Sequence, residues 1–163
     1  MKKKVIILFL ALLFPVAIFI FLKMFGKNEF QVPPLYQEGS MSTPQNCEVT
    51  YSVPYVVADS LFSALGMNRN DSLYVFYFDK ALDGPLHRIS VEFDGEPVKL
   101  VNPQSLRVNP YNRYLEECVL LMRGDTSVAL VDNKNRIRGY YNGEARDEVD
   151  RLILEMKIIL KQY

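Results

Sequence analysis

Three side chains in this sequence are of the types that most often carry out chemistry: two cysteines, Cys47 and Cys118, and one histidine, His87. A pair of cysteines exchanges disulfides when one is an exposed thiolate of low pKa and the other lies beside it. Cysteine and histidine together can bind a soft metal such as Cu(I). The two cysteines are far apart along the chain, so their spacing alone indicates neither chemistry.

Two placements of the cysteines are open at this point. In an oxidising compartment, a disulfide between Cys47 and Cys118 could fasten the segment that leads into the domain to its sheet. Closing so long a loop would contribute roughly 4 kcal/mol in the chain-entropy model. Alternatively, Cys118 is a buried core thiol and Cys47 is free. Redox or metal chemistry at the two cysteines is a lesser alternative.

The sequence contains no familiar catalytic arrangement. It has no Gly-rich phosphate loop, no His-Glu-x-x-His and no Gly-x-Ser-x-Gly motif. One histidine offers little general acid–base chemistry, and His87 is most simply a solvated side chain on a short helix. We therefore predict no catalytic residue, no cofactor and no metal ligand.

The formal net charge of zero combines a basic start with an acidic remainder. The chain has 19 Lys and Arg and 19 Asp and Glu, and residues 1–27 hold five of the cations and no acid. The remainder therefore keeps 14 cations against all 19 acids, a net charge of −5. Nucleic-acid binding usually requires a basic patch, so we predict that the domain binds no nucleic acid.

The basic start has the features of a membrane anchor. Residues 5–22 carry no charge, and such a run of helix rises roughly 27 Å, close to the thickness of the hydrocarbon core. Pro15 is tolerable inside a membrane helix. Lysines at positions 2–4 place the N-terminus in the cytoplasm by the positive-inside rule. An uncleaved anchor is favoured over a signal peptide because the apolar run is long and no small-x-small cleavage site follows it.

This interpretation divides the chain into four parts. Residues 1–4 are a basic cytoplasmic start, 5–25 a transmembrane helix in contact with lipid, 26–46 a Pro- and Ser-rich tether, and 47–163 an exported domain. The expected location is a bacterial inner membrane, crossed once, with the domain in the periplasm. Some apolar residues of the tether could still dock on a neighbour: Val32, Leu35 and Tyr36.

Strands and helices alternate in the predicted domain. We expect strands over residues 73–78, 98–101, 118–122, 127–131 and 136–141, and helices over 61–65, after Pro85, and over 146–161. Alternating apolar residues also predict an edge strand or hairpin over 49–57, and residues 102–113 are expected to be a loop. A strand–helix–strand unit followed by a hairpin and a closing helix predicts an α/β domain with a reduced, three-layer, thioredoxin-like layout.

Two stretches of the chain resemble a known family. LVDNKNRIRGYYNGEARDEVDRLILEMKIIL, which begins at Leu130, is similar to the C-terminal hairpin and helix of the SCO/SenC family. VPYVVADSLFSALGMNRNDSLYVFYF, which begins at Val53, resembles more loosely that family's first segment and first core strand. The resemblance implies a membrane-anchored, thioredoxin-like protein of a family linked to copper delivery and cytochrome c oxidase assembly.

The family's copper site is missing from this sequence. It consists of a Cys-x-x-x-Cys just after the first core strand and a distant histidine. Residues 79–87 correspond to the cysteine pair and contain no cysteine. The family's histidine would fall near Gly124, Asp125 and Thr126, and none of these can replace it. We therefore expect a degenerate active site, no bound copper, and a non-catalytic accessory or assembly factor that acts near respiratory oxidase through protein contact.

Four residues of the predicted hairpin are candidates for partner contact: Arg136, Arg138, Tyr140 and Tyr141. Tyrosine and arginine are favoured at interfaces. The simpler interpretation makes the two arginines exposed hairpin residues and the two tyrosines half-buried sheet residues. Two other functions remain as alternatives: a membrane-tethered thiol–disulfide or metal-handling protein that uses Cys47 and Cys118, and a stable accessory subunit of a membrane complex.

Overall fold

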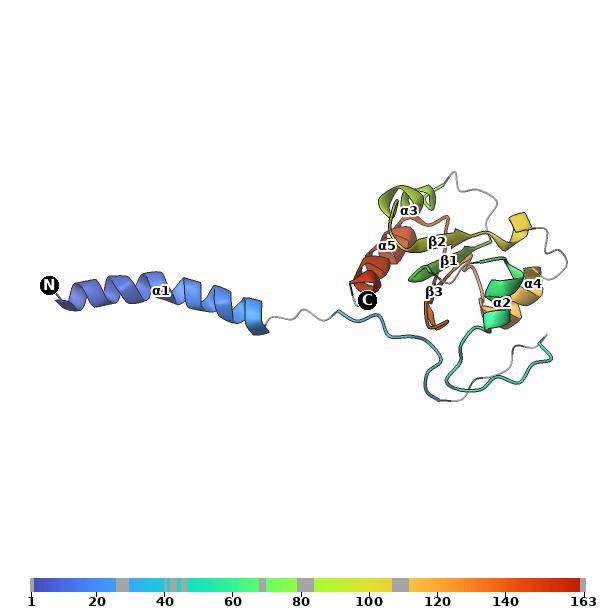
Figure 1. Ribbon diagram of the computed structural model, residues 1–163, viewed down its shortest axis with the longest axis horizontal. Coiled ribbons are helices and arrows are strands. Elements are labelled where there is room, and N and C mark those ends of the chain that lie inside the picture. The colour runs from blue at the N-terminus through green and yellow to red at the C-terminus, as the bar shows by residue number, and fades with distance from the viewer. Residues whose placement is uncertain are drawn as a thin grey trace. The chain divides into compact units, whose positions relative to one another are not determined.

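Figure 1 presents the computed structural model of the protein. It describes residues 2–25, 30–39, 41, 44, 47–67, 70–78, 84–106 and 112–161. The position that corresponds to the SCO/SenC cysteine pair, residues 79–87, therefore lies mostly outside the described residues. The chain forms two compact units, Met1–Gln31 and Val32–Tyr163.

The first unit contains the helix α1, Lys2–Phe25, with Pro15 inside it. Within the part of the chain that the structure describes, no helix has both the length and the apolar character needed to cross a membrane. The transmembrane helix over residues 5–25 therefore stays a prediction from the sequence.

A four-stranded mixed sheet in the order β2-β1-β3-β4 forms the centre of the second unit. The strands are β1, Leu73–Tyr77; β2, Val98–Val101; β3, Val128–Asp132; and β4, Ile137–Tyr141. β1 is parallel to β2 and antiparallel to β3, and β3 is antiparallel to β4. A helical crossover between β1 and β2 permits parallel pairing, whereas the short turn after β3 forces antiparallel pairing. The predicted α/β class is confirmed, as are the strands predicted at these four positions.

Helices cover both faces of the sheet (Figure 1). The first face carries α3 and α5 and the second carries α2; their bounds are His87–Glu92, Arg146–Leu160 and Asp59–Ala64. Because side chains alternate along a strand, β1 supplies Leu73 and Val75 to the first face and Tyr74 and Phe76 to the second. All four side chains are fully buried, as the uninterrupted apolar run predicts.

The prediction of a strand over residues 118–122 is wrong. A one-turn helix, α4 (Asn112–Tyr114), continues into a π-helix, η2 (Leu115–Val119), and the following residues are irregular but buried. Leu121 has a positive φ of 57°, which an extended strand does not allow. A continuous apolar run does not distinguish a buried strand from a buried helical turn. The expected loop before it also contains a short 3₁₀ helix, η1 (Pro103–Leu106).

The edge strand or hairpin predicted over residues 49–57 does not form. Pro54 has no N–H to donate to a ladder, and only isolated backbone bonds fix this segment: Tyr55 N to Tyr36 O over 2.9 Å and Val57 N to Asn135 O over 2.8 Å. The predicted alternation still describes which side chains face inward, since Tyr51, Val53, Tyr55 and Val57 are less exposed than the residues between them. We call residues 47–57 the strap.

The second unit begins inside the segment expected to be a tether. Leu35 N donates to Ile137 O over 2.8 Å, so residues next to Leu35 lie along β4, an outer strand of the sheet. Leu35 and Tyr36 pack against the core on the α2 face, and Val32 packs against the core on the α5 face. The three apolar tether residues that could dock therefore do so.

The start of α2 differs from its prediction. The helix begins at Asp59, Ala58 is its N-cap residue, and no side chain caps it. The Asp59 carboxylate instead accepts a hydrogen bond from the Asn135 amide over 2.7 Å, which links α2 to the turn between β3 and β4. On α3, Val91 is 66% exposed, so this apolar side chain lies outside the core.

Candidate functional site

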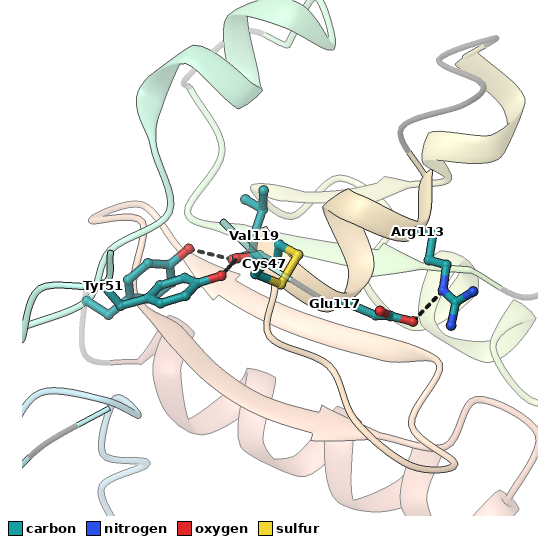
Figure 2. Close-up of a disulfide and its surroundings, with 7 residues drawn as sticks. Cys47, Tyr51, Arg113, Glu117 and Val119 are labelled. Carbon is teal, nitrogen blue, oxygen red and sulfur yellow. Dashed lines mark hydrogen bonds and ion pairs between the residues drawn. A yellow bond between two sulfur atoms is a disulfide. The ribbon is translucent and has the colours of Figure 1, made fainter. Parts of the chain in front are cut away.

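Cys47 and Cys118 form a disulfide, which is one of the two placements that the sequence leaves open. Their Cα atoms lie 5.6 Å apart, and the two residues are only 7% and 5% exposed. Cys47 begins the strap and Cys118 lies in η2. The disulfide therefore fastens the strap to the π-helix, as Figure 2 shows.

Tyrosine hydroxyls secure the same junction. Tyr51, Tyr55 and Tyr140 donate hydrogen bonds to the backbone carbonyl oxygens of residues 118, 119 and 120, each over 2.7 Å (Figure 2 for the strap pair). The last carbonyls of a helix have no partner within the helix, so side-chain donors stabilise its end. Two of the three hydroxyls come from the strap and one from β4. No local pattern in the sequence predicts the role of Tyr51 and Tyr55, although the alternation of apolar residues in the strap indicates that both face inward.

Burial determines the ionisation of these tyrosines. It raises the pKa of Tyr51, and together with the neighbouring tyrosines it raises the pKa of Tyr55 to about 12. Burial, followed by a hydrogen bond to Tyr36, raises the pKa of Tyr140 further. All three hydroxyls are neutral donors near pH 7, so they hold structure and are not poised for proton transfer.

Two open grooves are lined by residues of η2, and one of them reaches the disulfide. One, of about 410 Å³, is lined by Arg113, Tyr114, Glu117 and Cys118, but not by Cys47. The Arg113 Nε donates to the Glu117 carboxylate over 2.7 Å, and the Tyr114 ring is 45% exposed (Figure 2 for the ion pair). The second groove, of about 280 Å³, shares Glu117 with the first and is further lined by Pro44, Glu116, Met122, Arg123, Gly124 and Thr126.

The position expected for the SCO/SenC histidine lies on this second groove. Gly124 and Thr126 are among its lining residues, and neither side chain is a soft metal ligand. His87 is exposed on α3, where its Nδ1 lies 3.3 Å from the Ser90 hydroxyl. Among the described residues, no three His, Cys, Asp or Glu side chains gather in a way that could hold a metal ion.

The expectation that Arg136 and Arg138 are exposed hairpin residues is wrong. Asp132 at the end of β3 is fully buried, and its carboxylate accepts hydrogen bonds from the Nε atoms of Arg136 and Arg138, each over 2.8 Å. The side chain of Arg138 is only 6% exposed, and that of Arg136 is 23% exposed. Arg138 also donates to the carbonyl of Val32. A buried carboxylate requires such partners, so the hairpin draws both arginines inward.

Two opposing effects act on the pKa of Asp132. Burial by itself raises the pKa of this carboxyl. Hydrogen bonds from the Arg136 side chain and backbone and from Arg138 outweigh burial, and the pKa falls below its ordinary value. Asp132 is therefore a charged structural anchor of the hairpin.

The two hairpin tyrosines also point into the domain. Tyr141 is fully buried and donates to the Glu155 carboxylate on α5 over 2.5 Å, with the Arg151 guanidinium 4.6 Å from its ring centre. Burial and this hydrogen bond raise the pKa of Tyr141. Tyr140 is half-buried against the π-helix. The four residues predicted to contact a partner therefore make mainly internal contacts: Arg136, Arg138, Tyr140 and Tyr141.

The arrangement as a whole holds segments of polypeptide together. A disulfide and two hydroxyls attach the strap to η2, and a hydrogen bond from Arg138, the ion-pair partner of Asp132, attaches the carbonyl of Val32 to the hairpin. Beside this junction lies an open groove that offers an exposed tyrosine ring. No protein-family model, curated protein or solved structure matches the chain.

Proposed function

We propose that the protein is a membrane-anchored, thioredoxin-like protein of the SCO/SenC type that acts by binding other proteins. Its role would be that of a non-catalytic accessory or assembly factor of a respiratory cytochrome oxidase. One observation carries this proposal: both cysteines of the chain are joined in a buried disulfide between the strap and η2. A copper site like that of the resembled family needs two thiolates and an imidazole at one place, and this chain has no further cysteine to supply them.

The arrangement of the sheet supports the thioredoxin-like part of the proposal. The order β2-β1-β3-β4, with β1 and β2 parallel across α3 and a closing helix α5, is compatible with this layout. The link to oxidase rests on the resemblance of residues 130–160 to the SCO/SenC family. These residues form β4, α5 and most of β3, so the resemblance concerns the frame of the domain.

Sequence and chemistry support an exported domain on a bacterial inner membrane. The uncharged run over residues 5–22, with lysines before it, favours an anchor whose N-terminus is cytoplasmic. Disulfides persist in oxidising compartments such as the periplasm. A disulfide in the second unit is therefore compatible with the periplasm and less so with the cytoplasm.

Affinity purification from the native membrane tests the proposed function. The full chain, tagged at its C-terminus, is extracted in a mild detergent, and co-purifying proteins are identified by mass spectrometry. The matched control carries residues 1–31 and the same tag on an unrelated soluble domain, because it retains the proposed anchor alone. We expect subunits of a respiratory complex with the full chain and not with the control. Equal recovery from both, or recovery from neither, contradicts the proposal.

The same preparation separates transient assembly from permanent membership of a complex. An assembly factor should dissociate during size-exclusion chromatography in detergent. If the protein stays with the complex at a fixed ratio throughout, it is a stable accessory subunit, and the assembly role is wrong.

A further inference from the structure

One of the two grooves reaches the disulfide at Cys118. Cys118 lines the groove of about 410 Å³ together with Arg113, Tyr114 and Glu117, whereas Cys47 does not line it. In thiol–disulfide exchange a thiolate attacks one of the two sulfur atoms, and access decides which one. Both cysteines are largely buried, 7% exposed at Cys47 and 5% at Cys118, so the groove and not overall exposure distinguishes the approach to Cys118.

The strap is held unevenly along its length. Backbone hydrogen bonds fix Tyr55 and Val57, but among the described residues no backbone hydrogen bond joins residues 48–54 to the rest of the domain. That first part depends on the disulfide at Cys47 and on the hydroxyl of Tyr51. Losing the disulfide therefore leaves the first part of the strap held by Tyr51 alone, through its hydroxyl and the packing of its ring against the core and Tyr55.

The other end of the disulfide lies in an element that also depends on the strap. η2 is a π-helix, a form that is rare and occurs mostly as single turns, often at functional sites. Two of the carbonyls at its end accept hydrogen bonds from strap tyrosines. Releasing the strap thus removes side-chain partners from the end of the π-helix in the same event.

We propose that the disulfide between Cys47 and Cys118 is a reducible latch on the strap, opened by an external protein dithiol that attacks the sulfur of Cys118 from the groove. The attacking thiolate forms a mixed disulfide with Cys118, and Cys47 leaves as a thiolate and takes up a proton. The second thiol of the dithiol attacks the mixed disulfide, and Cys118 leaves and is protonated. Two electrons and two protons pass to the cysteine pair, and the dithiol becomes a disulfide. This reaction is independent of the proposed oxidase partner.

Trapping the mixed disulfide tests which sulfur is attacked. The full chain in mild detergent is mixed with a thioredoxin-type protein whose resolving cysteine is replaced by serine, quenched with acid, alkylated and mapped by peptide mass. We expect the adduct on Cys118 and the alkyl group on Cys47 in at least tenfold excess over the reverse. The urea-unfolded chain is the control, and it should form both adducts about equally. An adduct mainly on Cys47, or none where the unfolded chain forms one, overturns the proposal.

Limited proteolysis tests what reduction releases. Chymotrypsin cleaves after tyrosine, and we expect cleavage after Tyr51 in the strap to rise at least tenfold when dithiothreitol reduces the full chain. Cleavage after Tyr74, which is fully buried in β1, should stay unchanged. The variant Cys47→Ser should reproduce the reduced pattern without any reductant. An unchanged rate at Tyr51, or an equal rise at Tyr74 through global unfolding, contradicts the latch.

A groove variant separates protein access from intrinsic reactivity. Tyr114 is half-exposed on the groove and makes no contribution to the buried core. We expect Tyr114→Ala to slow reduction by the thioredoxin-type protein at least threefold and to leave reduction by dithiothreitol unchanged. If both rates are unchanged, the dithiol does not approach through this groove.

Discussion

Replacing Arg138 by leucine tests whether the buried ion pair of the hairpin is a structural anchor. Arg138 gives the fully buried Asp132 one of its two guanidinium partners and also donates to the carbonyl of Val32. Removing one partner of a buried ion pair typically costs 3–5 kcal/mol. Because Arg136 stays in contact with the carboxylate, we expect Arg138→Leu to lower the free energy of unfolding by about 3 kcal/mol, at the low end of that range.

The pH dependence of this effect identifies its origin. In the native protein the pKa of Asp132 lies below its ordinary value of 3.8, so its stabilisation is complete above that value and is lost as the pH falls through the lower, folded pKa. Without Arg138, burial raises the pKa of this carboxyl. The variant then loses the most stability at a pH at which the carboxyl is charged. The difference in stability between the two proteins should therefore shrink as the pH falls from 7 toward 3.

Urea unfolding of the full chain in mild detergent measures both quantities. The chain has 10 tyrosines and no tryptophan, so near-UV circular dichroism of the tyrosines reports the packed domain. Arg113→Leu is the control, because this arginine pairs with Glu117 at an exposed site and exposed pairs contribute little. A loss of stability no greater than that of the control, or one that is independent of pH, refutes the ion-pair argument.

The remaining predictions concern the tyrosines and a glycine. A Cβ at Gly139 would lie 2.8 Å from Cζ of the fully buried Tyr141, so Gly139→Ala should destabilise the domain by about 1–3 kcal/mol in urea unfolding, whereas Gly84→Ala, which meets no atom within 4 Å, should have little effect. Tyr55→Phe removes one neutral hydrogen bond to the π-helix and should cost about 1 kcal/mol in the same assay; an effect no larger than that of Tyr114→Phe would contradict this role. The folded pKa of Tyr55 is raised from 10.0 to about 12, so its stabilisation is complete below pH 10 and is lost as the pH rises toward 12. Two pKa units correspond to about 2.7 kcal/mol, which partial exposure reduces to roughly 1–2 kcal/mol, and stability that is flat from pH 9 to 12 would be contrary to this expectation.

Elements with strong local patterns could be predicted from the sequence. The apolar run at residues 73–78 became β1, the polar turn after residue 131 joined β3 to β4, and the helical stripe after residue 145 became α5. In each case the burial pattern and the neighbouring turn residues agree, so local information is sufficient. A short connection explains only the pairing of β3 with β4, because long stretches with helices join β1 to β2 and β2 to β3.

The errors arose where distant segments decide the outcome. Residues 118–122 are buried under the strap and β4. Their side chains are therefore all apolar, and the sequence shows the same apolar run as a buried strand. Arg138 looked like a solvated hairpin residue, yet it reaches both Asp132 and the carbonyl of Val32, which is 106 positions away. Neither contact leaves a local pattern.

The junction at the disulfide was only partly predictable. The number of cysteines allowed a bond between Cys47 and Cys118, but nothing local distinguished it from two separate thiols. The hydroxyls of Tyr51 and Tyr55 donate to carbonyls at the end of the π-helix over residues 115–119. The positions of these carbonyls depend on the π-helix, which the sequence did not predict. A site built from two irregular segments can be found only once both are placed.

Counting the thiols of the full chain tests the central claim most directly, because the proposed lack of a copper site and the proposed latch both depend on the same bond. The full chain is purified without reductant, unfolded, alkylated and weighed as an intact protein, and the measurement is repeated after reduction. We expect no alkyl group before reduction and one on each of Cys47 and Cys118 after it. Alkylation of both cysteines without any reductant would contradict it.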